Sequence, residues 1–233
     1  MDERILIDYK NVTINQQEHT ILEHVDFKLH AGNFVYLIGK VGSGKSTFLK
    51  TIYGELDIYE GDAWVLKQDM RSIKRKDIPA LRKRLGIVFQ DFQLLTDRTV
   101  KENLSFVLRA TGWKSKDEIE NRIAEVLQQV GMDNKGYKMP HELSGGEQQR
   151  IVIARAILNK PEIILADEPT GNLDVETGNR ITELLHQICQ QGSAIIMTTH
   201  NLNLLHEFPG KIFRCEDHQL HEVEDIEKNQ IEK

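Results

Sequence analysis

The sequence of 233 residues has little cysteine, no long apolar run and no excess of positive charge. Its two cysteines, Cys189 and Cys215, are too few for a disulfide framework, so the sequence fits a reducing compartment. No apolar run approaches the roughly 20 residues of a transmembrane helix, and the opening MDERILIDYK lacks the apolar core of a signal peptide. The net charge of −6 argues against a general nucleic-acid binder. We therefore expect a cytoplasmic domain that needs a partner for any membrane span.

What the sequence does contain is an alternation of short apolar runs and amphipathic stretches. Two β-rich runs, at 4–14 and 21–29, come first. Continuous apolar runs at 33–39, 162–168 and 193–200 have the pattern of strands buried on both faces. Helical spacing of apolar residues marks four further segments: 45–54, 114–131, 147–160 and 178–192. The alternation predicts an α/β fold with a parallel sheet.

A glycine-rich segment, GKVGSGKS, follows the expected strand 33–39 and opens the expected helix. It fits the P-loop pattern G-x-x-x-x-G-K-[ST], in which glycines turn the backbone so that its amides point at phosphate oxygens. Lys45 is expected to contact the β- and γ-phosphates, and Ser46 to offer a hydroxyl to Mg²⁺. The predicted nucleotide-binding residues of this segment are Gly39, Lys40, Val41, Gly42, Ser43, Gly44, Lys45, Ser46 and Thr47. The motif alone leaves kinases, GTPases and ATPases open.

Two neighbouring acids, Asp167 and Glu168, end the expected strand 162–168. A carboxylate at this place holds the Mg²⁺ of a P-loop nucleotide, usually through water, and Asp167 fits that role. The next carboxylate, Glu168, is suited to accept a proton from an attacking water as a general base. Charged pairs at the end of a strand are common, so the prediction depends on the P-loop upstream.

The segment LSGGEQQR, here called the signature segment (residues 143–150), opens the expected helix that follows it. Its nucleotide-binding candidates are Ser144, Gly145, Gly146 and Glu147. A helix start of this kind is a second anion site, because its first backbone N–H groups are free to bind phosphate oxygens. The segment has no lysine and no metal ligand of its own. We therefore expect it to close over a nucleotide that is held elsewhere.

Together these motifs resemble those of the nucleotide-binding subunits of ABC transporters, over nearly the whole chain. The resemblance implies the ABC ATPase fold of the P-loop NTPases, with a RecA-like parallel-sheet core, an N-terminal antiparallel β subdomain and a helical signature subdomain at about 91–160. We expect one ATP-binding domain over 1–220 and a polar, mobile tail over 221–233. The resemblance also implies a homodimer that holds two ATP molecules head to tail, and no nucleic-acid partner.

The same resemblance assigns the remaining site residues. Gln90, after GIVF, corresponds to the Q-loop glutamine that reaches Mg²⁺ and the attacking water; Asp174, in GNLD, faces the other subunit; and His200 contacts the γ-phosphate. The predicted catalytic residues are therefore Glu168, His200 and Lys45, and the predicted Mg²⁺ ligands are Ser46, Gln90 and Asp167. One departure concerns the adenine, which the family usually stacks on an aromatic residue. Asn15 or Gln16 stands there instead, so we expect weaker or less adenine-selective binding.

Within the family, IPALRKRLGIVFQDFQLLTDRTVKENL resembles ATPases of a bacterial cell-division complex that regulates cell-wall hydrolysis. The resemblance implies an integral membrane subunit that docks between Phe89 and Val100, at the cytoplasmic face of the inner membrane. The expected apolar anchors are Phe89, Phe92, Leu94 and Leu95, and the expected polar rim is Asp97 and Arg98. These residues could instead pack the helical subdomain and cap a helix near Thr99.

Other functions remain open at this stage. The ATPase of a lipoprotein-release or macrolide-exporter type of transporter is the nearest alternative, because it shares GEQQR and PTGNLD. A soluble ATPase acting on DNA or ribosomes and a non-hydrolysing adaptor fit less well. The basic segment 67–84 reads either as a solvated helix face with its connector or as a contact for lipid head groups.

Overall fold

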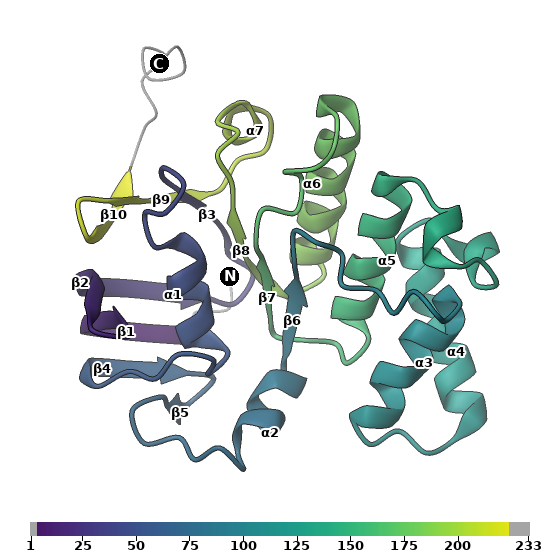
Figure 1. The fold of residues 1–233 in the computed structure, drawn as a ribbon, viewed down its shortest axis with the longest axis horizontal. Helices are drawn as coiled ribbons and strands as arrows, with labels where there is room; N and C mark the ends of the chain where they lie inside the picture. The colour runs from purple at the N-terminus through teal and green to yellow at the C-terminus, as the bar shows by residue number, and fades with distance from the viewer. Residues whose placement is uncertain (1–3, 224–233) are drawn as a thin grey trace.

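Two β-sheets form the frame of the protein, and helices cover them (Figure 1). The computed structural model describes residues 4–223. The smaller sheet contains β1 (Ile5–Gln16), β2 (His19–His30), β4 (Glu60–Val65) and β5 (Gln68–Asp69). Its order is β2-β1-β4-β5, with every pair antiparallel. This sheet is the expected N-terminal antiparallel β subdomain.

The larger sheet is parallel apart from one edge strand. It contains β3 (Phe34–Ile38), β6 (Leu85–Val88), β7 (Ile163–Ala166), β8 (Ala194–Thr198), β9 (Lys211–Glu216) and β10 (Gln219–Val223). The order is β10-β9-β3-β8-β7-β6, and β10 alone runs antiparallel to its neighbour. Because parallel strands end at the same edge, the segments that follow β3, β6, β7 and β8 gather there.

Both faces of the larger sheet are buried. In β3, Val35 and Leu37 join the hydrophobic cluster of the smaller sheet, whereas Phe34, Tyr36 and Ile38 join the cluster of the helical side. Successive side chains of a strand point to opposite faces, so a strand covered on both sides needs an unbroken apolar run. The prediction of an α/β fold with a parallel-sheet core is confirmed.

The helices fall into two groups around this sheet. Their bounds are α1 (Lys45–Ile52), α2 (Ile78–Lys83), α3 (Val100–Ala110), α4 (Lys116–Gln129), α5 (Gly145–Ile157), α6 (Val175–Gln190) and α7 (Asn203–Glu207). Two single 3₁₀ turns, Asp133–Lys135 and Pro140–Glu142, lie between α4 and α5. Helices α3, α4 and α5 stand together beside β6, on the side away from the smaller sheet (Figure 1). All three lie within the range 91–160 expected for the helical subdomain.

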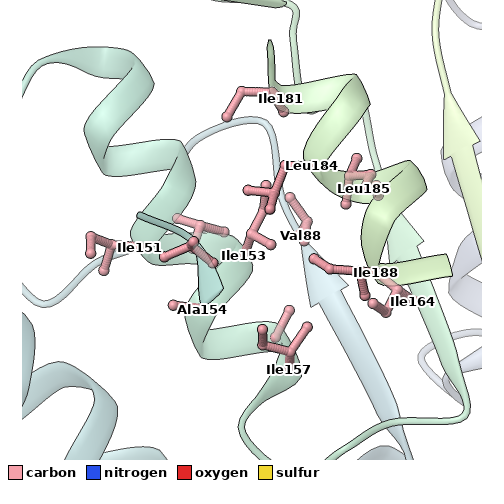
Figure 2. Packing of buried hydrophobic residues seen from close by; sticks show 14 of the residues in the cluster. Val88, Ile151, Ile153, Ala154, Ile157, Ile164, Ile181, Leu184, Leu185 and Ile188 are labelled. Carbon is pink, nitrogen blue, oxygen red and sulfur yellow. The ribbon is translucent and has the colours of Figure 1, made fainter. Parts of the chain in front are cut away.

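Helices α5 and α6 pack on each other and on the larger sheet. Figure 2 shows Ile153 of α5 and Leu184 of α6 close to Val88 of β6, with Ile164 of β7 beside Ile188 of α6. All five side chains are buried, and each fully buried aliphatic side chain contributes about 1.5–3 kcal/mol of stability. This packing fixes the start of α5, and thus the signature segment, relative to the sheet.

The C-terminal boundary differs from the sequence-based expectation. Residues 221–223 belong to β10, where Val223 pairs with Ile212 of β9, so the expected tail does not begin at 221. The pairing holds because Leu220 buries its side chain in the core. The rest of the predicted tail, 224–233, lies outside the described residues. Within 4–223, none of the helices is long and apolar enough to cross a membrane.

Candidate active site

The P-loop connects β3 to α1 in a conformation that only glycine fits. Gly39 has φ +146°, and a Cβ there would lie 2.4 Å from the Cys215 carbonyl oxygen. Gly44 has φ +105°, and a Cβ there would lie 2.8 Å from Ile21 Cγ2. Gly44 also offers no side-chain cap to α1. The backbone N–H groups of the first turn therefore stay available to an anion, which the helix dipole also favours.

The predicted P-loop residues surround an open cavity of about 840 Å³. Those that line it are Gly39, Lys40, Val41, Gly42 and Ser43, with His200 on its far wall. Ser46 is exposed and Thr47 half-buried in the first turn of α1. The cavity brings the loop backbone and His200 to the same space, although they are at least 157 positions apart in the chain, from Ser43 to His200.

Lys45 is the buried cation of the site, with 5% of its side chain exposed. Its Nζ donates to the carbonyl oxygens of Gly39, at 2.8 Å, and Lys40, at 3.0 Å. The same Nζ lies 4.0 Å from Oε1 of Glu168. The lysine predicted from the P-loop thus faces the acid predicted from a strand more than 100 residues later.

The acid pair is held by a threonine of the neighbouring strand. Thr198, at the end of β8, donates from Oγ1 to Oδ1 of Asp167 at 2.7 Å and accepts from the Glu168 N–H at 2.7 Å. Glu168 has φ +45°, an uncommon conformation for a residue other than glycine. Sequence reasoning missed Thr198. Its signal is a hydroxyl residue near the end of the apolar run that leads to His200.

Glu168 connects the lysine to the histidine. Its Oε2 lies 3.0 Å from Nδ1 of His200, while Oε1 faces Lys45. Glu168 is largely shielded, with 17% of its side chain exposed, whereas 58% of the His200 side chain is exposed. The three predicted catalytic residues therefore form one connected polar chain at the edge of the sheet, with the carboxylate in the middle.

Gln90 reaches this group through the segment after the acid pair. A Cβ on Gly171 would lie 3.2 Å from Gln90 Nε2 and 3.5 Å from Glu168 Oε2, so both side chains converge there. Asn172 also donates from Nδ2 to the Gln90 carbonyl oxygen at 3.4 Å. Sequence reasoning missed Gly171 and Asn172, which the motif GNLD contains. They link the Q-loop to the acid pair.

The residues predicted to hold Mg²⁺ offer the right kind of donor. Ser46, Gln90 and Asp167 supply hydroxyl, amide and carboxylate oxygens, and Mg²⁺ prefers oxygen ligands. One Asp167 oxygen accepts the bond from Thr198, and the other accepts no hydrogen bond from residues 4–223. No hydrogen bond joins the three side chains directly within that range. The donor set therefore fits an ion that also takes ligands from phosphate and water.

The signature residues Ser144 and Glu147 form hydrogen bonds with each other at the start of α5. Ser144 Oγ accepts from the Glu147 N–H at 3.3 Å, and the Glu147 carboxylate accepts from the Ser144 N–H at 2.9 Å. This backbone bond, with a 2.9 Å ion pair to Lys135, lowers the pKa of Glu147. A Cβ on Gly146 would lie 2.5 Å from Thr177 Cγ2, so α6 packs closely here.

Asp174 has the same kind of role at the start of α6. It accepts from the Thr177 N–H at 2.9 Å and from the Thr177 hydroxyl at 2.7 Å. In residues 4–223, no hydrogen bond or ion pair joins Ser144, Glu147 or Asp174 to the chain of Lys45, Glu168 and His200. The signature segment is separated from Lys45 because α1 and α5 begin on opposite sides of β6 and β7 (Figure 1). One chain thus carries two separate sets of predicted nucleotide contacts.

A groove of about 790 Å³ opens between α2, β6, α3 and α5. Of the four predicted docking anchors, only Phe89 lines it. Phe92 and Leu94 instead pack against the helical core cluster, and Leu95 is 38% exposed outside the groove. Thr99 caps α3, with its hydroxyl oxygen accepting from the Glu102 N–H. The segment therefore packs the helical subdomain and caps α3, and Phe89 alone of the predicted anchors lines the groove.

Arg155 of α5 ties the Q-loop segment to the helix that carries the signature. Its guanidinium donates to the carbonyl oxygens of Phe92, at 2.9 Å, and Gln93. Phe92 and Gln93 have φ +48° and +50°, so this arginine holds two successive residues in a left-handed turn. Arg155 also lines the groove. Sequence reasoning missed it, because its partners are backbone carbonyls far along the chain.

A family model described as "ABC transporter" matches residues 22–171, well over half of the chain. The chain belongs to the ABC transporter family. The matched range contains the P-loop, Gln90, the signature segment and the acid pair. The predicted family and the prediction of an ATPase are confirmed.

Curated members of this family resemble the chain over most of its length. The cell division ATP-binding protein FtsE of Streptococcus pneumoniae (serotype 2, strain D39) is 42% identical over 198 residues, which is 85% of this chain and 86% of the relative. FtsE of Bacillus subtilis (strain 168) is 41% identical, covering 84% and 86%. FtsE of Escherichia coli (strain K12) is 40% identical, covering 86% and 90%.

Solved ABC structures share the fold. The ATP-binding cassette MJ0796, described as a dimeric post-hydrolysis state bound to ADP and Pi, has a TM-score of 0.81 and 31% identity, covering 94% of this chain and 100% of that chain. The protein cbiO1 of Clostridium perfringens, part of the ABC transporter complex cbiONQ, has a TM-score of 0.86 and 26% identity, covering 94% and 88%. Both are similar to this ABC ATPase across its two sheets and its helices.

The departure at the adenine position has a structural counterpart in this ABC ATPase. Asn15 is half-buried near the end of β1, and its Oδ1 is buried with no hydrogen-bond partner among residues 4–223. The hairpin between β1 and β2 approaches the P-loop, since Ile21 and Leu22 contact the position of Gly44. An amide thus stands on the strand pair that contacts the P-loop, where an aromatic ring was expected.

Proposed function

We propose that this chain is the ATP-binding and ATP-hydrolysing subunit of an FtsE-like membrane complex that acts in bacterial cell division. The observation that carries the proposal is the position of Glu168, with one carboxylate oxygen 3.0 Å from His200 and the other 4.0 Å from Lys45. The identity of about 40% to FtsE proteins over most of the chain supports the cell-division role.

Hydrolysis follows from these contacts. The P-loop amides and Lys45 bind the β- and γ-phosphates. Ser46, Gln90 and Asp167 would hold Mg²⁺, which would neutralise phosphate charge when bound. Glu168 orients a water and takes its proton as it attacks the γ-phosphate in line. The developing negative charge is stabilised by Lys45 and His200, which already lie on either side of the base.

The signature half acts on a second copy. Ser144, Gly145 and Gly146 stand at the start of α5, away from Lys45 of the same chain, so a head-to-tail homodimer is the arrangement in which they contact ATP. Glu147 and Asp174 belong to the same face in this proposal. The similar cassette MJ0796 is described as a dimer with ADP and Pi. Two ATP molecules then lie at the interface.

The groove beside Phe89 is the proposed docking place for an integral membrane subunit of the FtsX kind. The groove is lined by the apolar residues Phe89, Val107 and Ala156. The cations Arg82 and Arg155 line it as well. Gln93 lines the same groove and follows Gln90 by three residues. Closure of the dimer therefore reaches the membrane subunit, and through it the control of cell-wall hydrolysis. In this proposal the chain is peripheral at the cytoplasmic face of the inner membrane.

Co-purification with a co-expressed membrane subunit tests this function. Phe89→Glu places a charge in the groove, so we expect loss of the complex with ATP binding retained. Tyr137→Glu is the matched control, because that aromatic side chain is 72% exposed and lies outside the groove. A Phe89→Glu protein that still forms the complex contradicts docking at this place.

A further inference from the structure

Positive charge is concentrated in one segment of an otherwise acidic chain. Residues 67–84, here called the basic segment, contain eight lysines and arginines and two aspartates. The segment therefore carries +6, while the whole chain carries −6, which leaves −12 on all other residues. Such a separation of charge along the chain indicates which partners the protein can bind, and it says nothing about the fold.

Only part of that charge is used inside the protein. Arg71 donates to the Gly61 carbonyl oxygen, Arg82 to those of Tyr53 and Gly54, and Arg84 pairs with Glu162 at 2.6 Å. Five cations of the segment have no side-chain hydrogen bond or ion pair within residues 4–223. They are Lys67, Lys74, Arg75, Lys76 and Lys83, all of them exposed.

Three of these cations, Lys74, Arg75 and Lys76, form the basic turn, which the N-cap residue Asp77 connects to α2. The next residues of α2 line the groove: Pro79, Ala80, Arg82 and Lys83. In Figure 1 the turn and α2 lie at the lower end of the molecule, whereas β7 and β8 lead to the acid pair and His200 at the upper end. The unpaired charge therefore borders the groove and stands away from the nucleotide.

We propose that the basic turn binds the head groups of anionic lipids at the membrane surface. The inference takes one step from the proposed function, because a groove that receives a membrane subunit must face the bilayer. At an anionic surface, each lysine or arginine within a Debye length strengthens binding about fivefold. Three cations on one short turn thus give on the order of a hundredfold.

The distribution of charge favours a membrane over a nucleic acid. A nucleic acid that extends beyond the turn meets the remaining surface, which carries −12. A bilayer touches only the end of the molecule that faces it, so the acidic remainder stays in solvent. The contact is electrostatic, because the side chains of the turn are cationic and exposed and no apolar side chain interrupts them.

Vesicle flotation with the full chain tests the proposal without any partner protein. We expect binding to vesicles of equal parts phosphatidylcholine and phosphatidylglycerol at low salt, loss of binding at about 0.5 M salt, and none to phosphatidylcholine alone. K74A/R75A/K76A should weaken the binding on the order of a hundredfold. K10A/K28A/K211A, which removes the same charge from exposed lysines on β1, β2 and β9, should keep it.

Several results would overturn the proposal. They are no binding to the anionic vesicles at low salt, equal weakening by the two triple variants, and tighter binding to an oligonucleotide that displaces the chain from vesicles. A fourth is that K74A/R75A/K76A loses the membrane subunit in detergent but still binds vesicles, which makes the turn a protein contact. The vesicle assay uses the isolated chain, so its outcome is separate from whether the proposed partner docks at the groove.

Discussion

The P-loop side and the signature side of this ABC ATPase use their polar residues in opposite ways. On the P-loop side, Glu168 contacts both Lys45 and His200, which come from distant parts of the chain. On the signature side, Ser144 and Asp174 bond only to their own helices. Folding brings the P-loop-side residues together, whereas Ser144 and Asp174 remain exposed on the surface. One set of predicted site residues is thus connected within one chain, and the other set is left exposed, as the proposed head-to-tail dimer requires.

The largest effect is expected from removing the proposed base on the P-loop side. Glu168→Gln keeps the shape of the side chain but cannot take a proton, so we expect kcat to fall by about 10²- to 10⁴-fold with ATP binding retained. Steady-state phosphate release and nucleotide titration measure the two effects. Glu162→Gln, at the other end of β7, is the matched control and should keep normal turnover. Normal turnover of Glu168→Gln would remove Glu168 from the role of base.

Mixing two inactive variants tests whether the two halves work in different copies. Lys45→Ala damages the P-loop half and Ser144→Arg the signature half, so each alone should be inactive. A mixed dimer pairs the intact P-loop of one chain with the intact signature of the other, because a two-fold symmetric contact is reciprocal. We therefore expect ATPase activity to return on mixing.

The control for this experiment is a mixture of Lys45→Ala and Glu168→Gln. Both changes lie on the P-loop side, so every site in a mixed dimer has one damaged P-loop half and no activity should return. Crosslinking confirms that mixed dimers form. If they form and neither mixture regains activity, the head-to-tail arrangement is contradicted.

Sequence could predict what depends on local pattern. The P-loop follows from glycine spacing between a strand and a helix, and the acid pair from its place at the end of an apolar run. Thr198, Asn172 and Arg155 could not be predicted in this way. Each acts through a bond to another segment, and that contact depends on how the strands and helices pack rather than on any repeat or spacing. The predicted docking segment is another example: Phe89 lines the groove and Phe92 packs against the helical core, and only the packing of the fold decides which does which.

A smaller effect, on ATP affinity, is expected at Asn15, where the P-loop side lacks the aromatic residue that the family usually has. Asn15→Tyr supplies the missing ring beside the P-loop, and stacking of a base on an aromatic side chain is worth roughly 1–3 kcal/mol. We therefore expect ATP to bind about 5- to 150-fold more tightly, with a larger gain for ATP than for GTP. Equilibrium titration with a fluorescent nucleotide measures this gain. Gln16→Tyr is the matched control; if it gives the gain and Asn15→Tyr does not, the position has been assigned one residue too early.

The smallest effect concerns the self-contained caps of the signature half. The Ser144 N–H bond and Lys135 lower the pKa of Glu147 below its ordinary value near 4.5. The ionised carboxylate therefore stabilises the fold above that value, and this contribution disappears as the pH falls through the lowered pKa. Because 30% of the Glu147 side chain is exposed, we expect Glu147→Gln to cost about 0.5 kcal/mol of unfolding free energy at neutral pH and less near pH 3. Urea unfolding at both pH values measures it, with Glu118→Gln, in the first turn of α4, as a control that removes no side-chain hydrogen bond within residues 4–223. An equal cost at both pH values would mean that the carboxylate does not cap this helix, and the signature half would then be less self-contained than its contacts indicate.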